Sequence, residues 1–260
     1  MIKKISLLIP GLFIFLSLIN LYFDWDPYQM NFDLILQTPN FSSFFGYDDY
    51  GRNIFIRLIN GFLTSFKIVF LATLISFFIG SFLGVLSAFI GGFYDRLFLN
   101  LISIIQAFPG ILLIIAISAF LEVSFWNILI ALTITSWVGF ARIARVQTLT
   151  LKEQDFIKAA ITMGSSNLSI VFKHLIPNTL SALFVELNYT FANLIVAEAG
   201  LAFLGMGLSS PFPSWGAMLR DSIDYLLIAP HYTITVGSSI MLMILSFNSI
   251  GRSLAFNIEK

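Results

Sequence analysis

The chain has 260 residues, of which 58% are hydrophobic and only 11% are charged, whereas an ordinary soluble domain carries about 25% charged residues. One soluble core of this size cannot bury so much apolar surface, including 29 phenylalanines, so the composition predicts an integral membrane protein. The formal net charge of zero gives no sign of a nucleic-acid partner, and the lack of cysteine excludes disulfides and thiolate metal sites.

The N-terminal segment MIKKISLLIPGLFIFLSLINLYF combines a basic start with an apolar run, as a secretory signal peptide does. Its uncharged run, Ile5–Phe23, is 19 residues long, however, and no small-residue cleavage site follows it. We therefore expect residues 1–23 to be a retained first membrane span.

Uncharged runs along the chain predict the membrane spans, because a spanning helix needs about 20 mostly apolar residues. Five such runs are Ile5–Phe23, Ile68–Tyr94, Leu97–Leu121, Val123–Ala141 and Tyr232–Gly251. A sixth, Leu175–Leu208, is interrupted only by Glu186 and Glu198. The sequence thus predicts an all-α integral membrane protein with six transmembrane helices. It divides into the first span, an extracytoplasmic loop at 24–63, a five-helix core at 64–251 and a cytoplasmic tail at 252–260.

The basic residues orient these spans. With the N-terminus inside, ten of the 14 lysines and arginines fall on the cytoplasmic side, and only Arg52, Arg57, Lys67 and Arg220 fall outside. This distribution obeys the positive-inside rule, so we expect both termini to be cytoplasmic. Outside, the charged residues at 220, 221 and 224 are expected to belong to a solvated loop.

Two features within the spans concern helix packing. Gly80, Gly84 and Ala88 recur at a spacing of four, which allows a neighbouring helix backbone to approach closely. Pro109 lies inside the third predicted span and should kink it, either as a fixed bend or as a hinge for gating.

The longest predicted cytoplasmic segment, residues 151–178, contains two short amphipathic patterns. The first places Phe156, Ala159, Ala160 and Met163 on one helix face. Gly164 then follows as a residue typical of helix C-termini. Possible N-caps at 165–167 precede a second apolar pattern over 168–175. Pro177 marks where this second helix stops, bends or enters the membrane.

These patterns predict a helix–turn–helix projection, which we call the cytoplasmic knob (residues 151–178). The residues themselves leave two functions open. The knob could lie on the bilayer surface as an interfacial helix, or it could dock into a groove of a soluble partner. The turn between the two helices favours docking.

The knob sequence KAAITMGSSNLSIVFKHLIPN resembles the EAA motif of permease subunits in ATP-binding-cassette (ABC) importers. Ala159, Ala160, Gly164 and Pro177 match the spacing of that motif. The chain departs from it at three positions: Lys158 replaces a glutamate, His174 an isoleucine and Ile176 a leucine. A basic residue and a histidine before the final proline are typical of the dipeptide/oligopeptide/nickel branch.

The resemblance extends over most of residues 45–219. FGYDDYGRNIFIRLINGFLTSFKI is similar to a G-T-D-x-x-G-R-D segment of the same branch, and AEAGLAFLGMGLSSPFPSWGAML is similar to its A-E-A…P-S-W-G signature. The likeness is to the second permease subunit of that branch, the dipeptide-permease C type.

This resemblance implies a set of partners. A second homologous permease subunit would complete the translocation path, two cytoplasmic ATP-binding subunits would bind the knobs, and an extracytoplasmic solute-binding protein would deliver cargo at a bacterial inner membrane. It also places the ATPase-coupling residues in the knob; these are Phe156, Lys158, Ala159, Ala160, Met163, Gly164, His174 and Pro177. Because Lys158 is basic, any salt bridge made by the motif's glutamate would have to be absent, reversed or made by Glu153 or Asp155.

Several functions are excluded or disfavoured by the residues. The chain has no G-x-x-x-x-G-K-[ST] loop, so we expect no cofactor in this chain and ATP on the partner subunits. Its two histidines, His174 and His231, fall on opposite sides, so we expect neither a metal site nor an enzyme. A secondary transporter would need inverted repeats or intramembrane charge pairs, which are not evident, and a scaffold would not explain the knob.

The translocation path and the cargo are less defined. An acidic residue inside the membrane is energetically costly and usually has a function. Glu186 and Glu198 are therefore candidates for the translocation path, together with Pro109. For Glu198, which lies within the A-E-A signature, the alternative is a structural hydrogen bond between helices. Glu186 lies only nine residues beyond Pro177, so its alternative is a place near the inner interface rather than at the membrane centre. The branch carries dipeptides, oligopeptides or nickel, and we expect a peptide cargo, with nickel or a nickel chelate as the alternative.

Overall fold

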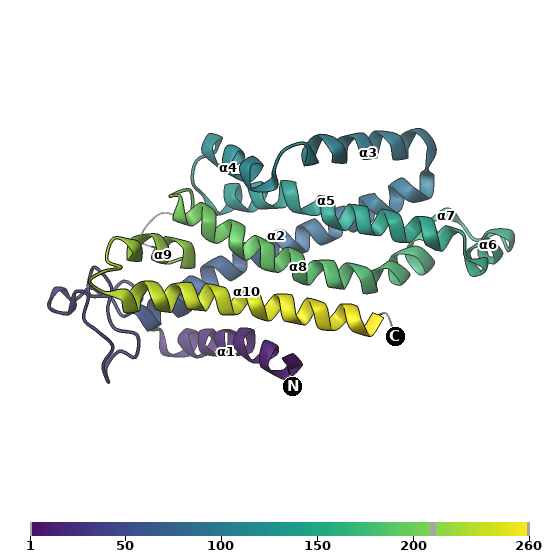
Figure 1. The fold of residues 1–260 in the computed structure, drawn as a ribbon. Helices are drawn as coiled ribbons and strands as arrows, with labels where there is room; N and C mark the ends of the chain where they lie inside the picture. The colour runs from purple at the N-terminus through teal and green to yellow at the C-terminus, as the bar shows by residue number, and fades with distance from the viewer. Residues whose placement is uncertain (1, 209–211, 259–260) are drawn as a thin grey trace.

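The computed structural model of the chain describes residues 2–208 and 212–258 (Figure 1). Its regular elements in these ranges are all helical, which confirms the predicted fold class. They are α1 (Ile2–Phe23), a 3-10 turn (Phe32–Leu34), α2 (Ile54–Ile90), α3 (Gly92–Gln106), α4 (Gly110–Phe120), α5 (Phe125–Lys152), α6 (Asp155–Thr162), α7 (Asn167–Ile170), a π-helical segment (Val171–Leu175), α8 (Ile176–Phe203), α9 (Trp215–Ile223) and α10 (Pro230–Ile258).

Four of the described helices are long and apolar enough to cross a membrane. They are α2, the continuous helix Asn167–Phe203 that contains α8, α5, and α10 over Pro230–Ala255. α3 and α4 add a fifth span if the two are counted together. α1 falls among the shorter apolar helices, with its apolar stretch at Leu7–Phe23. The structure therefore gives a multi-pass membrane protein with four or five spans by these criteria, where the sequence predicts six.

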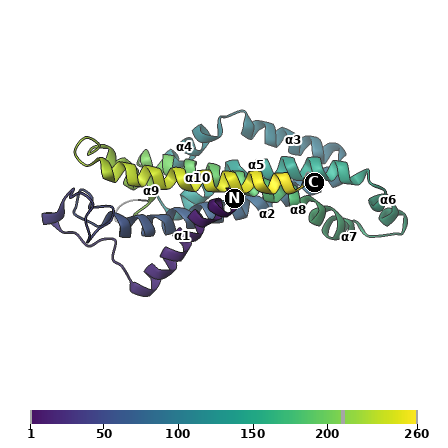
Figure 2. The same cartoon turned by 60° about the horizontal axis from the view of Figure 1, so that its bottom comes forward.

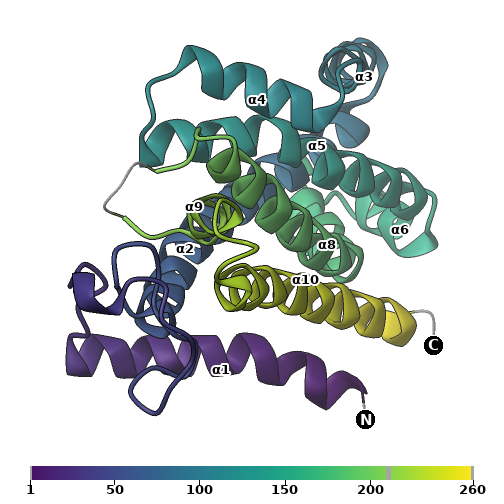
Figure 3. The same ribbon diagram turned by 60° about the vertical axis from the view of Figure 1, so that its left-hand side comes forward.

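The long helices alternate in direction along one bundle (Figures 1 and 2). α2, α5 and α10 run toward the end that carries α6, whereas α1 and α8 run away from it. α9 and the loop before α2 lie at the opposite end. The first turn of α1 and the last turn of α10 therefore point toward the same end of the bundle (Figure 3).

α2 packs along α5 through the small residues that the sequence singles out. A Cβ added at Gly80 would lie 2.8 Å from Phe140 Cβ, and one at Gly84 would lie 3.0 Å from Ala141 Cα. These separations are too short for a larger residue, because overpacking a close contact costs about 1–3 kcal/mol. The predicted close approach at this spacing is confirmed.

α2 begins well before the predicted start of its span at Ile68. Its N-cap is Asn53, whose Oδ1 accepts hydrogen bonds from the backbone N–H groups of Phe55 (3.0 Å) and Ile56 (3.4 Å). Residues 54–63, assigned by the sequence to the extracytoplasmic loop, are therefore helical. In the sequence the uncharged run is ended by Lys67, which is exposed in the structure, although the helix continues past it. The earlier charged residue, Arg57, is buried in the fold.

The third predicted span, Leu97–Leu121, is broken rather than kinked. α3 ends at Gln106, α4 begins at Gly110, and the two helices meet at an angle of 79°. Pro109 occupies the N-cap position of α4 with extended backbone angles (φ −56°, ψ 125°). Because proline lacks a backbone N–H, the chain leaves the helix here. Whether the break acts as a hinge stays a prediction.

Candidate functional site

The turn of the cytoplasmic knob is built by backbone hydrogen bonds at the end of α6. The N–H of Ser165 donates to Ala160 O (3.0 Å), and the N–H of Gly164 donates to Ile161 O (3.0 Å). This pair is the Schellman motif, which needs a left-handed residue at its first position after the helix. Gly164 has φ +80°, so its predicted role at the helix C-terminus is confirmed.

The second knob helix starts as predicted but does not end at the proline. Ser166 is the N-cap of α7, and its Oγ accepts a hydrogen bond from the N–H of Ser169 (3.3 Å). The chain then continues through the π-helical segment into α8 without a break. Pro177 lies in the first turn of α8, where Asn178 Nδ2 donates to His174 O (2.6 Å). The sequence predicted that this helix stops, bends or enters the membrane at Pro177. In the structure it continues into α8 and so enters the helix bundle.

The knob presents apolar side chains to its surroundings. Met163 is 80% exposed and Leu168 is 71% exposed. We define the knob surface by the exposed apolar residues of α6, its C-terminal turn, α7 and the π-helical segment: Phe156, Ile161, Met163, Leu168 and Phe172. Their exposure confirms the predicted apolar face for the first helix at positions 156 and 163.

A second set of apolar side chains anchors the knob to the bundle. Ile157, Ile170, Val171 and Leu175 are buried in one cluster with residues of α2, α5 and α8. Ala160 is also buried, at 4% exposure, whereas Ala159 is exposed. Helical spacing placed Ala160 on the exposed face, and this prediction is wrong. Ala160 lies at the border of the face that Ile157 occupies, because residues three apart are neighbours on a helix.

The polar side chains of the knob make few contacts. Lys158 Nζ lies 3.5 Å from Glu153 Oε2, and both side chains are exposed. Such a surface ion pair contributes little to stability. His174 is half-buried, and its ring centroid lies 6.3 Å from that of Phe156. The eight sequence-predicted coupling residues are therefore all at one end of the molecule, and Lys158 and the exposed apolar residues face outward.

Glu186 borders two neighbouring cavities between α5 and α8. One, of about 490 Å³, also includes Gly110 at the start of α4, and the other, of about 350 Å³, includes Arg142. Thr190 Oγ1 donates to Glu186 Oε1 at 3.3 Å. Gly139 faces the same carboxylate so closely that a Cβ there would collide with it. The structure thus brings Glu186 and the segment after Pro109 to one cavity.

Glu198 does not join this site. It is buried, and its Oε2 has no hydrogen-bond partner among the described residues. Along α8 it lies about 18 Å from Glu186 and about 120° around the helix axis, since each residue rises 1.5 Å and turns 100°. The two glutamates therefore face different surroundings.

Sequence reasoning missed a charged cluster at the opposite end from the knob. Buried Asp48 accepts hydrogen bonds at Oδ1 from the N–H groups of Tyr50 (2.9 Å) and Arg52 (2.8 Å). Its Oδ2 lies 2.7 Å from Arg52 Nε and 3.2 Å from Arg57 Nε. The resemblance of GYDDYGR to a family segment was the signal that could have drawn attention to it.

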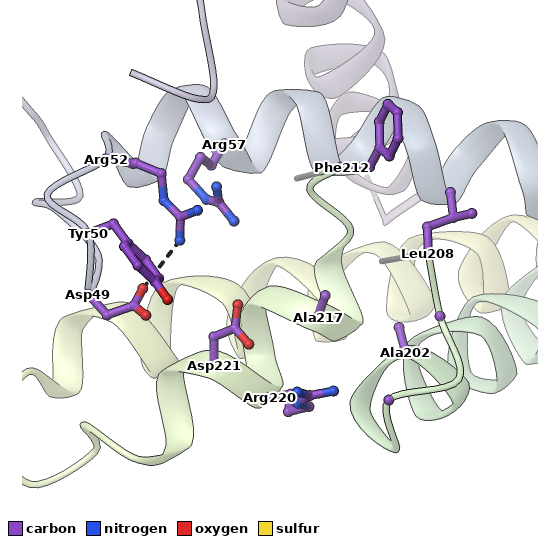
Figure 4. Close-up of a pocket in the computed structure, with 12 residues that line it drawn as sticks. Asp49, Tyr50, Arg52, Arg57, Ala202, Leu208, Phe212, Ala217, Arg220 and Asp221 are labelled. Carbon is purple, nitrogen blue, oxygen red and sulfur yellow. Dashed lines mark hydrogen bonds and ion pairs between the residues drawn. The ribbon is translucent and has the colours of Figure 1, made fainter. Parts of the chain in front are cut away.

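A cavity of about 380 Å³ adjoins this cluster (Figure 4). Asp49, Arg52 and Arg57 line it on one side, and Arg220 and Asp221 of α9 line it on another. Burial raises the pKa of Asp49 and of Asp221 above the usual value. The expectation that residues 220–224 form a solvated loop is wrong for Asp221, which is half-buried on α9. In the described part of the chain, no group of three or more His, Cys, Asp or Glu residues is arranged to hold a metal ion.

Comparison with known proteins identifies the family to which this chain belongs. Residues 76–260 match the family model described as "Binding-protein-dependent transport system inner membrane component". The dipeptide transport system permease protein DppC of Alkalihalophilus pseudofirmus is 40% identical over 219 residues, covering 84% of this chain and 72% of that protein. The glutathione transport system permease protein GsiD of Pectobacterium atrosepticum is 35% identical over 252 residues, covering 94% of this chain and 83% of that protein.

Solved structures share the fold. An inward-facing structure of the MetNI methionine ABC transporter contains a chain that aligns with a TM-score of 0.60 at 22% identity, covering 76% of this chain and 95% of that one. The family match spans well over half of the sequence, and the predicted resemblance to importer permeases is confirmed. The chain belongs to the family of inner membrane components of binding-protein-dependent transport systems.

Proposed function

We propose that the chain is a permease subunit of an ATP-driven importer and forms half of a translocation path for short peptides. In this proposal α1 and the broken α3–α4 helix complete six spans, and both termini are cytoplasmic. A second, similar permease supplies the other half of the path. Two ATP-binding subunits act on the cytoplasmic side, and a solute-binding protein delivers the cargo outside.

The knob surface is the observation that carries this proposal. Five apolar side chains are exposed on a two-helix projection whose other side is buried against the bundle. An apolar helix face of this kind suits a groove in a soluble partner. The membrane-surface alternative is less favoured, because the Schellman turn at Gly164 makes a compact projection instead of one helix that could lie flat on lipid.

The connections of the knob suggest how movement would reach the path. α6 follows α5 directly, and α7 continues into α8, so a displacement of the knob acts on both helices. α5 and α8 also line the cavity that holds Glu186. A partner whose contact with the knob differs between its ATP-bound and ATP-free states would therefore bias the two helices between alternative positions.

The cargo class rests on the relatives. Two of them, at 40% and 35% identity, are named as dipeptide and glutathione permeases. Neither name concerns nickel, so we propose a peptide as the cargo rather than the metal. ATP is placed on the partner subunits, since this sequence lacks a phosphate-binding loop.

Uptake by the assembled importer tests the proposal. The full-length chain is co-purified with its candidate permease and ATP-binding partners, reconstituted in proteoliposomes, and supplied with labelled dialanine and the solute-binding protein. We expect uptake that needs ATP and all components. Uptake without the ATP-binding subunits would instead identify a secondary transporter, and no uptake of any short peptide would reject the cargo class.

A further inference from the structure

The cavity beside Arg57 is enclosed by residues from four parts of the chain. They come from the loop before α2, the start of α2, the end of α8 with residues that follow it, and α9. Its volume of about 380 Å³ lies within the range of about 300–1,000 Å³ that is usual for small-molecule sites. It lies at the end of the bundle opposite the knob and includes neither Glu186 nor Glu198.

Arg57 carries unused hydrogen-bonding capacity at this cavity. Its side chain is only 4% exposed, and its Nη1 has no hydrogen-bond partner among the described residues. Its Nε is within ion-pair distance of Asp48 Oδ2 but is not aligned for a hydrogen bond. A buried guanidinium donor without an acceptor is costly, so this geometry is suited to an incoming anionic group. Figure 4 shows Arg57 extending from α2 toward Asp221 on α9.

The other charged side chains indicate which class of ligand would fit. Three arginines and three aspartates gather here, so the formal charge sums to zero: Arg52, Arg57 and Arg220 against Asp48, Asp49 and Asp221. Asp48 and Asp49 are engaged with Arg52. In the described part of the chain, Arg220 and Asp221 make no ion pair within 4.0 Å. The cavity thus offers cationic groups and one carboxylate to a ligand that is neutral overall and carries both charges.

The other wall of the cavity is apolar. Leu208 and Phe212 line it, with Ala202 and Ala217 below them. Small-molecule sites combine such an apolar lining with a few polar groups that fix orientation. A free phosphate or a metal ion would leave this wall unused.

We propose that this cavity binds a small zwitterion of the amino-acid or short-peptide class. The ligand's carboxylate pairs with Arg57 and Arg220, its ammonium group pairs with Asp221, and its side chain contacts Leu208 and Phe212. This inference rests on the proposed function, since it makes the cavity an outer recognition site for peptide cargo within the permease itself.

Direct binding of dialanine to the assembled, full-length importer tests the site. Isothermal titration compares the wild type with Arg220→Met and Asp221→Asn, two variants at the accessible side of the cavity that leave the buried Asp48 pair intact. Asp224→Asn, exposed at the end of the same helix, and Arg252→Met, exposed in α10, are the matched controls. Loss of one charged contact should weaken binding about tenfold or more, and the controls should bind as the wild type does.

Modified ligands test the contributions of the peptide's carboxylate and ammonium groups separately. Dialaninamide lacks the carboxylate, so it should bind about tenfold more weakly than dialanine to the wild type, and Arg220→Met should weaken it little further. N-acetyl-dialanine lacks the ammonium group and should be insensitive to Asp221→Asn. Equal affinity for dialanine and its amide, or unchanged binding in both cavity variants, would overturn the site.

Two further outcomes distinguish this inference from the proposed function. If dialanine does not bind and both cavity variants import it at the wild-type rate, the outer site is overturned while the permease function stands. If dialanine does not bind but Arg220→Met weakens capture of the solute-binding protein, the cavity receives a protein side chain, which also overturns the small-ligand site. Failure of the wild-type importer to transport peptide rejects the proposed function instead.

Discussion

Arg145 of α5 holds Asp95 of α3 by two parallel contacts: Nε lies 2.7 Å from Oδ1, and Nη2 lies 2.7 Å from Oδ2. Ser87 Oγ of α2 donates to the same Oδ1 at 2.7 Å. Further along α5, Lys152 Nζ donates to the carbonyl oxygens of residues 88 and 89 near the end of α2 (3.0 and 3.2 Å). These contacts join the C-terminal part of α5 to α2 and α3, immediately before the chain continues into the knob.

Replacing Asp95 by Asn should destabilise the protein. A two-point contact between guanidinium and carboxylate is a strong, charge-assisted interaction, and both side chains are less than one-fifth exposed. We expect the free energy of unfolding to fall by about 1–3 kcal/mol, measured as a lower thermal midpoint of the purified protein. Asp33→Asn, at an exposed position in the loop before α2, is the control. Equal midpoints for the two variants would show that the ion pair does not stabilise the fold.

Gly164→Val should uncouple transport from ATP hydrolysis. A Cβ at this position would have no heavy atom within 4 Å, so the cost of the substitution comes from the backbone, which has φ +80°. An L-residue pays about 1–2 kcal/mol in this left-handed region, and a β-branched residue is especially disfavoured there. The turn would rearrange and displace the knob surface. Assembled importer carrying Val should hydrolyse ATP but import little peptide.

Gly164→Asn is the matched control for this prediction, because asparagine tolerates the left-handed region better than most other residues. It should transport at a rate between those of the wild type and the valine variant. Wild-type transport by Gly164→Val would show that the turn is not part of the coupling surface.

Photo-cross-linking from Met163 should capture an ATP-binding subunit. Met163 is highly exposed on the knob surface, whereas Ala160 in the same helix is buried against the bundle. A cross-linker at position 160 should therefore remain within the chain. Leu227, exposed at the opposite end of the molecule, serves as the distant control. Capture of lipid alone from position 163 would favour the bilayer-surface location of the knob.

The knob and the packing of α2 were predictable because their signals are local. Gly164 ends a helix through its own backbone, Ser166 caps the next helix, and Gly80 marks a close helix contact by its spacing. These features depend on residues within a few positions of each other, and the structure places all of them as expected.

The failures of sequence reasoning arose where distant residues decide the structure. The start of α2 was missed because the uncharged run begins only after Lys67, which left Arg57 in the predicted loop. The partner of Arg57, Asp48, lies in a loop whose path the sequence does not reveal. The exposure of Ala160 was misjudged because helical spacing does not say which neighbouring element covers a face. The cavity beside Asp221 is lined by residues from four separate parts of the chain, so no local sequence pattern predicts it.

The half-buried Asp221 should give the peptide-free protein a pH-dependent stability. Burial raises the pKa of this carboxyl above its usual value of 3.8, although Arg57 and Arg220 oppose the shift. The folded state therefore binds the proton more tightly than the unfolded state does. Ionising Asp221 costs stability once the pH rises above the raised pKa, and this cost disappears as the pH falls toward 3.8.

Asp221→Asn removes this titration, because the amide stays neutral at every pH. Its thermal midpoint should exceed that of the wild type at pH 8, and the difference should shrink as the pH is lowered toward 4, because Asp221 gains its proton in the folded state before it does in the unfolded state. Thermal scans of both proteins across this pH range measure the effect without added peptide. Asp49 stays unchanged in both proteins, so its own raised pKa largely cancels in the comparison. A lower midpoint for Asp221→Asn than for the wild type at pH 8 would mean that the ionised carboxylate stabilises the fold through its arginine neighbours, contrary to the direction expected from burial.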